Sequence, residues 1–227
     1  MEGSQLVVTH ILRGVEEPAR LHERVVAFRA AIAKVVAGDT QLFVGDEVEK
    51  GQSAPDRRTD LSGTPVFLAI TPLAPEFDAG AALTALAPAQ EHLVTGTTGN
   101  ESWLLKHQFE RRRDIGAPVP GDAWLQIVMM NVDAAVEDEF NDWYDQEHVE
   151  RIAAVAPEFL FVKRMQALVG TPHYVALWRM TDRRGPERDP WLAASETPWT
   201  RRIRRFMRDR RRFMLAPFRA TRSNATA

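Results

Sequence analysis

Cysteine is absent from this chain of 227 residues. The absence excludes disulfides, thiolate metal sites and cysteine nucleophiles. No run of about 18 apolar residues occurs, so the sequence predicts no membrane-spanning helix and no membrane partner. The first residues lack the basic and apolar segments of a secretory leader, and we therefore expect a soluble, cytoplasmic protein. The 29 Lys and Arg residues against 31 Asp and Glu give a net charge of −2, which argues against nucleic acid as a partner.

Several catalytic and binding motifs are also missing. The sequence contains no Gly-x-Ser-x-Gly elbow, no phosphate-binding loop and no dinucleotide-binding glycine pattern. No histidine pair has the spacing of a zinc site, so we expect no metal. Eight arginines lie between Arg201 and Arg212. We interpret them as a solvated helix face that pairs with acidic side chains, although a subset could bind a substrate carboxylate.

A repeated segment connects the two halves of the chain. GTPVFLAITPLAP runs from Gly63 to Pro75, and GTPHYVALWRMTD runs from Gly170 to Asp182. Both segments begin with Gly-Thr-Pro, which is typical of a turn, and both continue into residues that favour a β-strand. An internal repeat of this kind indicates that the two halves are built on the same plan.

The elements around the repeat correspond between the halves. Besides the Gly-Thr-Pro strand, the first half is predicted to hold strands at 6–12, 41–48 and 102–110 and helices at 18–36 and 79–93. The second half is predicted to hold strands at 125–131, 159–168 and 213–220 and helices at 134–155 and 197–207. Each half therefore has the order β-α-β-β-α-β of a ferredoxin-like unit.

The predicted fold class is α+β, with two ferredoxin-like units packed sheet to sheet as an α+β barrel within one chain. A single unit leaves one sheet face uncovered, and a second unit can cover it. We assign residues 1–114 to a degenerate repeat that serves as scaffold, 115–122 to a linker rich in Pro and Gly, 123–222 to the repeat with the site, and 223–227 to a disordered tail. The alternative is two linked domains without a shared core.

The segment from residue 136 to 155 carries the strongest functional signal. Apolar residues recur in it at helical spacing and form one stripe, which consists of Val136, Phe140, Trp143, Tyr144, Ile152 and Val155. His148 lies four residues from both Tyr144 and Ile152, so its side chain is expected to face the sheet. An inward histidine is a candidate for proton transfer because it titrates near neutrality. The alternative is a core histidine whose ring binds a backbone carbonyl.

The stretch EFNDWYDQEHVERI, followed by a strand and GTPHYVALWRM, resembles the EthD-type branch of the dimeric α+β barrel superfamily. The Phe–x–x–Trp/Tyr–Tyr–x–x–x–His pattern of that branch corresponds to Phe140, Trp143, Tyr144 and His148. The resemblance covers about residues 122–218. The superfamily includes muconolactone-type isomerases, polyketide cyclases, cofactor-free monooxygenases and haem-dependent enzymes, so the resemblance implies the fold more strongly than the reaction.

The first half departs from this pattern. Its predicted helix keeps an apolar stripe but has no histidine near its end, and His22 lies near its start and off the stripe. We therefore expect the first half to be scaffold and the chain to have one site.

Helical spacing and the resemblance together predict the residues of that site. His148 would act as general acid or base beside a substrate carbonyl, and Tyr144 would orient the substrate oxygen or donate to it. Trp143 and Phe140 would form the aromatic wall of a pocket between helix 136–155 and the sheet of the second half.

Three further residues are candidates for substrate binding. His173 shares a strand face with Arg179, and if that face meets the helix, His173 shares a cavity with His148. Otherwise, His173 lies at the seam between the sheets or at a strand end. Arg164 or Arg179 would stabilise a developing oxyanion.

The preferred prediction is a lyase or isomerase that uses no cofactor and transfers a proton on a largely apolar, aromatic or polyketide-like substrate with a carbonyl or lactone group. One alternative is an oxygen-using monooxygenase or a haem enzyme on the same scaffold. Another is a protein that binds a small molecule, or acts as a scaffold, without catalysis. The expected partner is a small-molecule substrate, and the chain is expected to be a monomer or a homodimer.

Overall fold

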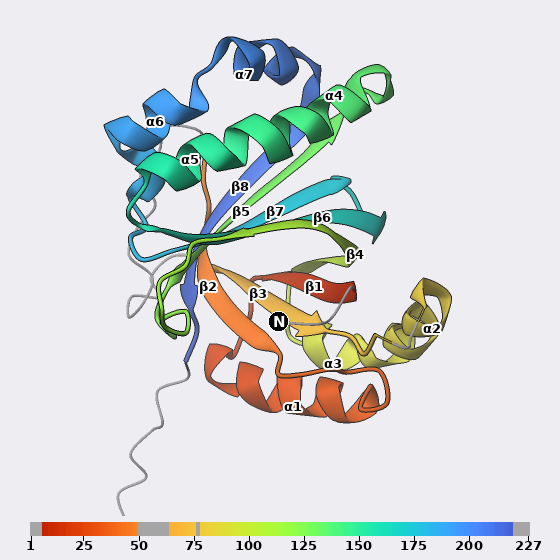
Figure 1. The fold of residues 1–227 in the computed structure, drawn as a ribbon. Coiled ribbons are helices and arrows are strands. Elements are labelled where there is room, and N and C mark those ends of the chain that lie inside the picture. The colour runs from red at the N-terminus through yellow and green to blue at the C-terminus, as the bar shows by residue number, and fades with distance from the viewer. Residues whose placement is uncertain (1–5, 50–63, 76–77, 220–227) are drawn as a thin grey trace, which may run out of the picture.

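The computed structural model describes residues 6–49, 64–75 and 78–219. Eight antiparallel strands form a closed barrel, with helices on its outside (Figure 1). The strands are β1 (Leu6–Arg13), β2 (Gln41–Glu47), β3 (Val66–Pro72), β4 (Gly99–Arg112), β5 (Trp124–Val132), β6 (Phe159–Val169), β7 (Tyr174–Met180) and β8 (Met207–Pro217).

The helices lie in two groups on opposite sides of the barrel (Figure 1). The first group consists of η1 (Pro18–Arg20), α1 (Leu21–Ala31), α2 (Ala79–Ala89) and α3 (Glu91–Val94). The second group consists of η2 (Ala134–Val136), α4 (Glu137–Asp142), η3 (Trp143–His148), α5 (Val149–Val155), η4 (Gly185–Glu187), α6 (Asp189–Ser195), α7 (Pro198–Ile203) and η5 (Arg204–Phe206). None of the described helices is long and apolar enough to cross a membrane.

The two halves contribute four neighbouring strands each. Their orders are β4-β1-β3-β2 and β8-β5-β7-β6, so each half has its fourth, first, third and second strand in turn. The β2–β8 and β4–β6 pairings join the halves into one barrel. The α+β class is therefore confirmed. The sheets of the two halves do face each other, as predicted, but backbone hydrogen bonds also join them along both edges. The alternative of two domains without a shared core is wrong.

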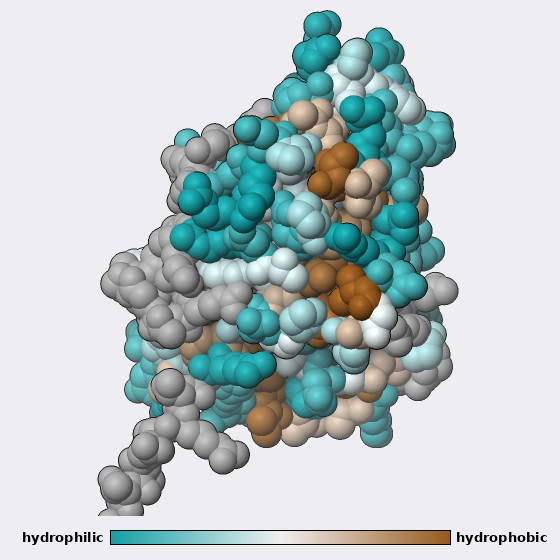
Figure 2. Space-filling model, turned by 60° about the vertical axis from the view of Figure 1, so that its left-hand side comes forward, coloured by the Kyte–Doolittle hydropathy of each residue, from teal (hydrophilic) through white to brown (hydrophobic). Residues whose placement is uncertain are grey.

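Side-chain alternation divides the core into three layers. Residues from both halves fill the barrel interior, among them Ile11, Phe43, Leu177 and Phe213. The outer face of each half packs against its own helices, which gives one cluster around Phe28 and another around the tryptophans of the second half. On the face that Figure 2 shows, hydrophobic side chains reach the surface in small patches among hydrophilic ones.

A glycine lies at each seam between the halves. At the β2–β8 seam, a Cβ on Gly45 would lie 2.0 Å from the carbonyl oxygen of Met214. At the β4–β6 seam, Gly170 has a φ of +99°, and a Cβ there would lie 2.4 Å from the ring of Trp103. The Gly-Thr-Pro turn of the second half therefore needs its glycine for close approach between strands. Gly63 of the first-half turn lies outside the described residues.

The structure corrects the prediction for the end of the chain. The predicted helix at 197–207 ends at Ile203, with one 3₁₀ turn after it, and β8 begins at Met207 rather than at 213. The ladder with β5 pairs this arginine-rich stretch, and Asp209, with a φ of 51°, accompanies an irregularity in that pairing. Helix α6 was not predicted. Residues 223–227, predicted as a tail, lie outside the described part of the chain.

Candidate functional site

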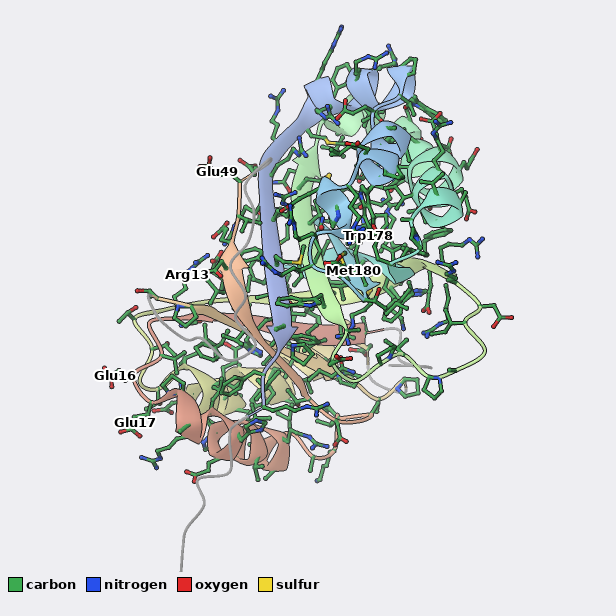
Figure 3. All side chains as sticks on the ribbon, turned by 90° about the vertical axis from the view of Figure 1, so that its left-hand side faces the viewer. Arg13, Glu16, Glu17, Glu49, Trp178 and Met180 are labelled. Carbon is green, nitrogen blue, oxygen red and sulfur yellow. The ribbon has the colours of Figure 1, made fainter. Side chains whose placement is uncertain are left out.

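A cavity of about 1000 Å³ lies between the second-half helices and the outer face of β5, β7 and β8. Aromatic side chains from three elements line it, namely Trp143, Tyr144, Trp178 and Trp191. In Figure 3, Trp178 lies on the strand side of the cavity. Glu49, which also lines the cavity, lies just beyond the end of β2. The predicted location of the pocket, between helix 136–155 and the sheet, therefore holds such a cavity.

The helix over this cavity contains a π-helical turn, η3. The backbone N–H of Val149 donates to the carbonyl of Tyr144, five residues earlier, instead of four as in an α-helix. Residues five apart diverge on an α-helix, but i→i+5 bonding brings them nearly one above the other. Accordingly, the ring centroids of Trp143 and His148 lie 4.6 Å apart. The turn places Trp143, Tyr144 and His148 together on the cavity wall.

His148 is half-buried within an aromatic cage. The ring centroids of Tyr144 and Trp178 lie 5.1 Å and 5.9 Å from that of His148. Its Nδ1 atom is buried and has no hydrogen-bond partner among the described residues. The structure therefore does not have the alternative arrangement, in which Nδ1 of a core histidine bonds to a backbone carbonyl.

The surroundings of His148 keep its ring neutral. Burial lowers the pKa of His148 to about 3, because the charged ring is poorly solvated, and the positive charges of Arg204, Arg164 and Arg210 lower it further. At neutral pH the imidazole can therefore accept a proton, but it is a weak base until a negative charge comes close.

Tyr144 is a proton donor in the same cavity. Burial raises the pKa of Tyr144 to about 12, so the hydroxyl keeps its proton at neutral pH. Nε1 of Trp178 donates to this hydroxyl at 3.2 Å. The hydroxyl proton has no acceptor among the residues that the structure describes, and it is available to a ligand oxygen.

Arginines from β8 and from the turn before it add positive charge to the cavity. Arg204 makes two hydrogen bonds to Glu196, at 2.6 Å and 3.0 Å. Arg210 makes no ion pair with a described residue, and burial and Arg204 both lower its pKa. An unpaired guanidinium near Tyr144 and His148 favours a ligand with a negative group.

Arg164 and Phe140 support the site from behind the cavity wall. Arg164 is 3% exposed, pairs with Asp145 and donates to Asn141 at 2.7 Å. Its guanidinium lies 4.4 Å from the ring centroid of Tyr144. Phe140 is fully buried, with its ring 4.8 Å from that of Tyr174. Neither residue lines the cavity, so both position Tyr144 rather than contact a ligand there.

His173 and Arg179 do not share this cavity. The face of β7 that meets the helices carries Tyr174 and Trp178, whereas Arg179 faces the barrel interior and stacks on Phe43 at 5.1 Å. His173 precedes β7, and its Nε2 lies 2.9 Å from the amide nitrogen of Gln166. The hypothesis that His173 and His148 share a cavity is wrong because the opposite strand face packs on the helices.

Sequence reasoning missed Trp178 and Arg210 as lining residues. Alternation along the strand puts Trp178 on the face opposite His173, together with Tyr174, and these bulky aromatic residues could have identified that face as the side under the helices. Arg210 is exposed, in agreement with the interpretation of solvated arginines, but it lies on a strand rather than a helix and it also lines the cavity. Among the described residues, no group of three His, Asp or Glu side chains could hold a metal ion.

No family model and no curated protein matches the chain. Solved structures do match it. The likeness is one of fold. An anthrone oxidase-like protein has a TM-score of 0.60 at 13% identity, over 100% of this chain and 98% of that one. A monooxygenase candidate from Fusobacterium nucleatum has a TM-score of 0.55 at 12% identity, over 96% and 94%.

A mutant of chlorite dismutase from Candidatus Nitrospira defluvii has a TM-score of 0.53 at 10% identity, over 94% of this chain and 92% of that one. These three matches span nearly the whole chain and show that the solved structures share its α+β barrel fold. At such low identity they show the fold and leave the reaction to be argued from the site.

Proposed function

We propose that this protein is an enzyme that removes a proton from a largely apolar aromatic or polyketide-like ketone and lets dioxygen oxidise the resulting anion. One observation carries the proposal. A neutral His148 and a protonated Tyr144 line the same aromatic cavity of about 1000 Å³. A base and a hydrogen-bond donor side by side can take a proton next to a carbonyl and stabilise the enolate oxygen.

Each residue has a separate role in this mechanism. His148 accepts the proton from carbon, Tyr144 donates a hydrogen bond to the developing oxyanion, and Trp143 and Trp178 hold the ring system. A negative group of the substrate at Arg204 and Arg210 would offset charges that hold the pKa of His148 down. Binding of an anionic substrate therefore makes His148 a stronger base.

The same first step allows a lyase or an isomerase. If the proton returns to another atom, the product is an isomer, and no oxygen is consumed. Proteins of the same fold that are named anthrone oxidase-like and monooxygenase candidates favour the oxygen-using outcome. For an anthrone, one ketone and one O₂ would give one quinone and one water.

The cavity residues also fit a haem. A neutral histidine such as His148 is the usual haem ligand, and Arg184, Arg204 and Arg210 could pair with the propionates. A bound haem would supply oxidant chemistry at the cavity. An absorbance spectrum and native mass of the purified protein decide this second candidate first, because a Soret band and the added mass would establish it.

We also infer that the two halves are copies of one ferredoxin-like unit and that the chain is an EthD-like protein. The matching strand orders support this inference. In this interpretation residues 1–114 are scaffold, 115–122 link the copies, and 123–222 carry the site. One active site per chain follows.

Anthrone is a suitable probe of the proposed reaction. Oxygen uptake with anthrone should fall about 10²–10⁴-fold in the His148→Ala variant, which is the usual contribution of a general base. His173→Ala is a matched control, since it removes a half-buried histidine outside the cavity, and its rate should stay unchanged. Equal loss in both variants, or none in either, would contradict the role of His148.

Anaerobic exchange in D₂O separates the remaining outcomes. An enzyme that removes the proton should exchange the acidic CH₂ hydrogens of anthrone without oxygen, and this exchange should depend on His148. Exchange without oxygen uptake in air would favour an isomerase or lyase. Binding without exchange would favour the non-catalytic alternative.

A further inference from the structure

A second cavity of about 500 Å³ lies at one rim of the barrel, away from His148. It is formed where β2 and β6 begin and where β4, β7 and β8 end, together with the linker residues 118–121. It shares no lining residue with the cavity of His148. Its apolar lining includes three aromatic rings, Phe43, Phe161 and Phe218, and two linker prolines.

The lining of this second cavity is positively charged. Among the described residues, four cationic side chains contribute to it, namely Arg112, Lys163, Arg179 and Arg219, and no Asp or Glu does. Glu110, just outside the lining, lies 2.9 Å from Arg112 and 3.0 Å from Lys163. One carboxylate therefore serves two cations, and it does not reach Arg179.

Arg179 is the decisive residue. It is only 8% exposed, yet it makes no hydrogen bond or ion pair with a described residue, and its Nε is buried without a partner. Burial lowers the pKa of Arg179 to about 10, and the charge of the linker residue Asp122, which acts in the opposite direction, offsets this only in part. Its guanidinium lies 5.1 Å from the ring centroid of Phe43. The contact with the ring orients the guanidinium plane, while its N–H groups donate no hydrogen bond to a described residue.

The opposite rim shows what a compensated arginine looks like in this barrel. Arg211 bonds to Glu101 at 2.5 Å and 2.9 Å and to Glu47 at 2.7 Å, and Arg13 bonds to Glu47 at 2.6 Å. Two arginines there face two carboxylates. A buried charge without such partners is unfavourable in a folded protein unless a ligand of opposite charge pairs with it.

We propose that the cavity around Arg179 is a second ligand site, for a small organic anion in which a carboxylate or phosphate is attached to an aromatic ring. The guanidinium of Arg179 binds the anion through two parallel N–H groups, with Lys163 and Arg112 beside it. Phe161, on which Arg112 stacks at 4.7 Å, contacts the ring of the ligand together with Phe218.

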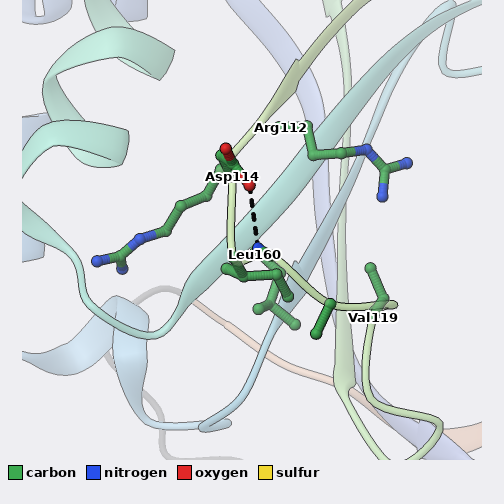
Figure 4. A pocket seen from close by; sticks show the side chains of 8 residues that line it. Arg112, Asp114, Val119 and Leu160 are labelled. Atoms are coloured by element: carbon green, nitrogen blue, oxygen red, sulfur yellow. Dashed lines mark hydrogen bonds between the residues drawn. The ribbon is translucent and has the colours of Figure 1, made fainter.

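The linker between the halves forms one wall of this site. On its other side lies a smaller cavity of about 370 Å³, where Gly116 donates its backbone N–H to Asp114 at 3.0 Å (Figure 4). Val119 and Arg112 line both cavities. The linker is therefore part of the binding surface as well as a connection between the halves.

The test measures binding of 1-naphthoate to the full chain by isothermal titration calorimetry, with 1-naphthamide as the neutral analogue and inorganic phosphate as the anion without a ring. We expect saturable binding of naphthoate, at least tenfold weaker binding of the amide, and competition by phosphate if the site prefers phosphate esters. The His148→Ala variant should bind naphthoate equally well at this site.

Two variants of Arg179 make the test specific. Arg179→Met should weaken naphthoate binding at least tenfold and raise Tm by about 2–4 °C, because a buried charge that Asp122 compensates only in part is removed. Arg179→Lys should recover part of the affinity. Arg188→Met, which removes an exposed arginine outside both cavities, should change neither quantity.

Three outcomes would overturn the proposal. The first is no saturable binding of naphthoate or phosphate by the native chain. The second is binding that Arg179→Met leaves unchanged, and the third is a lower Tm with unchanged binding, which would make Arg179 structural. Loss of naphthoate binding only in His148→Ala would assign the probe to the other cavity and also count against this site.

Discussion

The two helix layers of this barrel cover sheets of the same strand order in different ways. In the first half, α1 to α3 close over an apolar cluster, and His10 is fully enclosed in it, 5.3 Å from the ring of Phe28. In the second half, the helices leave a large cavity, and His148 lines it. Both histidines lack a partner for Nδ1 among the described residues, and burial lowers the pKa of both.

The comparison teaches that a shifted pKa does not by itself identify a functional residue. His10 has the same kind of shift as His148, but no ligand could reach it through the side chains around it. What distinguishes His148 is access from a cavity that also holds a proton donor and unpaired positive charge. The first half thus serves as an internal control for the second.

The largest expected effect on stability comes from Arg164, the buried arginine that supports the second-half helices. Arg164→Ala removes a buried guanidinium together with its part-buried bonds to Asp145 and Asn141, and it should lower the free energy of unfolding by about 3–5 kcal/mol. Arg20→Ala, which removes two exposed ion pairs of the first half, should cause no detectable change. Urea unfolding of both variants measures the contrast, and equal stability of the two would show that Arg164 contributes little.

The next effect concerns acid stability and His10. The folded His10 stays neutral down to about pH 4, whereas the unfolded residue takes up a proton near pH 6.5. The unfolded chain therefore binds more protons between these values, so stability falls as the pH falls through this range, by about 3 kcal/mol for His10.

Replacement by an apolar residue tests this assignment. His10→Leu should flatten the pH dependence of urea unfolding between pH 6.5 and 4 and leave the turnover proposed for His148 unchanged. The remaining slope should come partly from His148. An unaltered slope in His10→Leu would mean that other groups cause the acid sensitivity.

A smaller effect is expected where the cavity wall bonds to α7. Trp143 donates its Nε1–H to the hydroxyl of Thr200 at 3.1 Å, in a buried position. Thr200→Val keeps the shape but leaves this donor unpaired, and it should lower stability by about 1–3 kcal/mol. Thr200→Ser is the matched control because it keeps the hydroxyl. A valine variant as stable as the serine variant would show that water replaces the bond.

Much of the fold could be predicted because its signals are local. The apolar period of residues 136–155 predicts both the helix and the inward direction of His148, and the structure has both. The π-helical turn could not be predicted, since it depends on packing against the sheet. Arg179 was assigned to the wrong cavity because alternation sorts a strand into two faces without telling which one meets the helices.

The arginine-rich end shows a different limit. Thr197 and Pro198 do begin a helix, as their types indicate. Arginine also favours helices, so the stretch after Ile203 gives no local sign that a strand begins at Met207. Only pairing with β5 and β2 on both sides determines that strand, and this pairing is a property of the whole barrel.

Closure of the barrel also limits how copies of this protein could associate. Every described strand of the barrel has a strand neighbour on both sides, so no edge strand offers unpaired backbone groups to another chain. A homodimer of this chain would have to form through side chains of the helices or rims. The same closure protects a newly made chain from joining its sheet to that of a neighbour, provided that both seams form early.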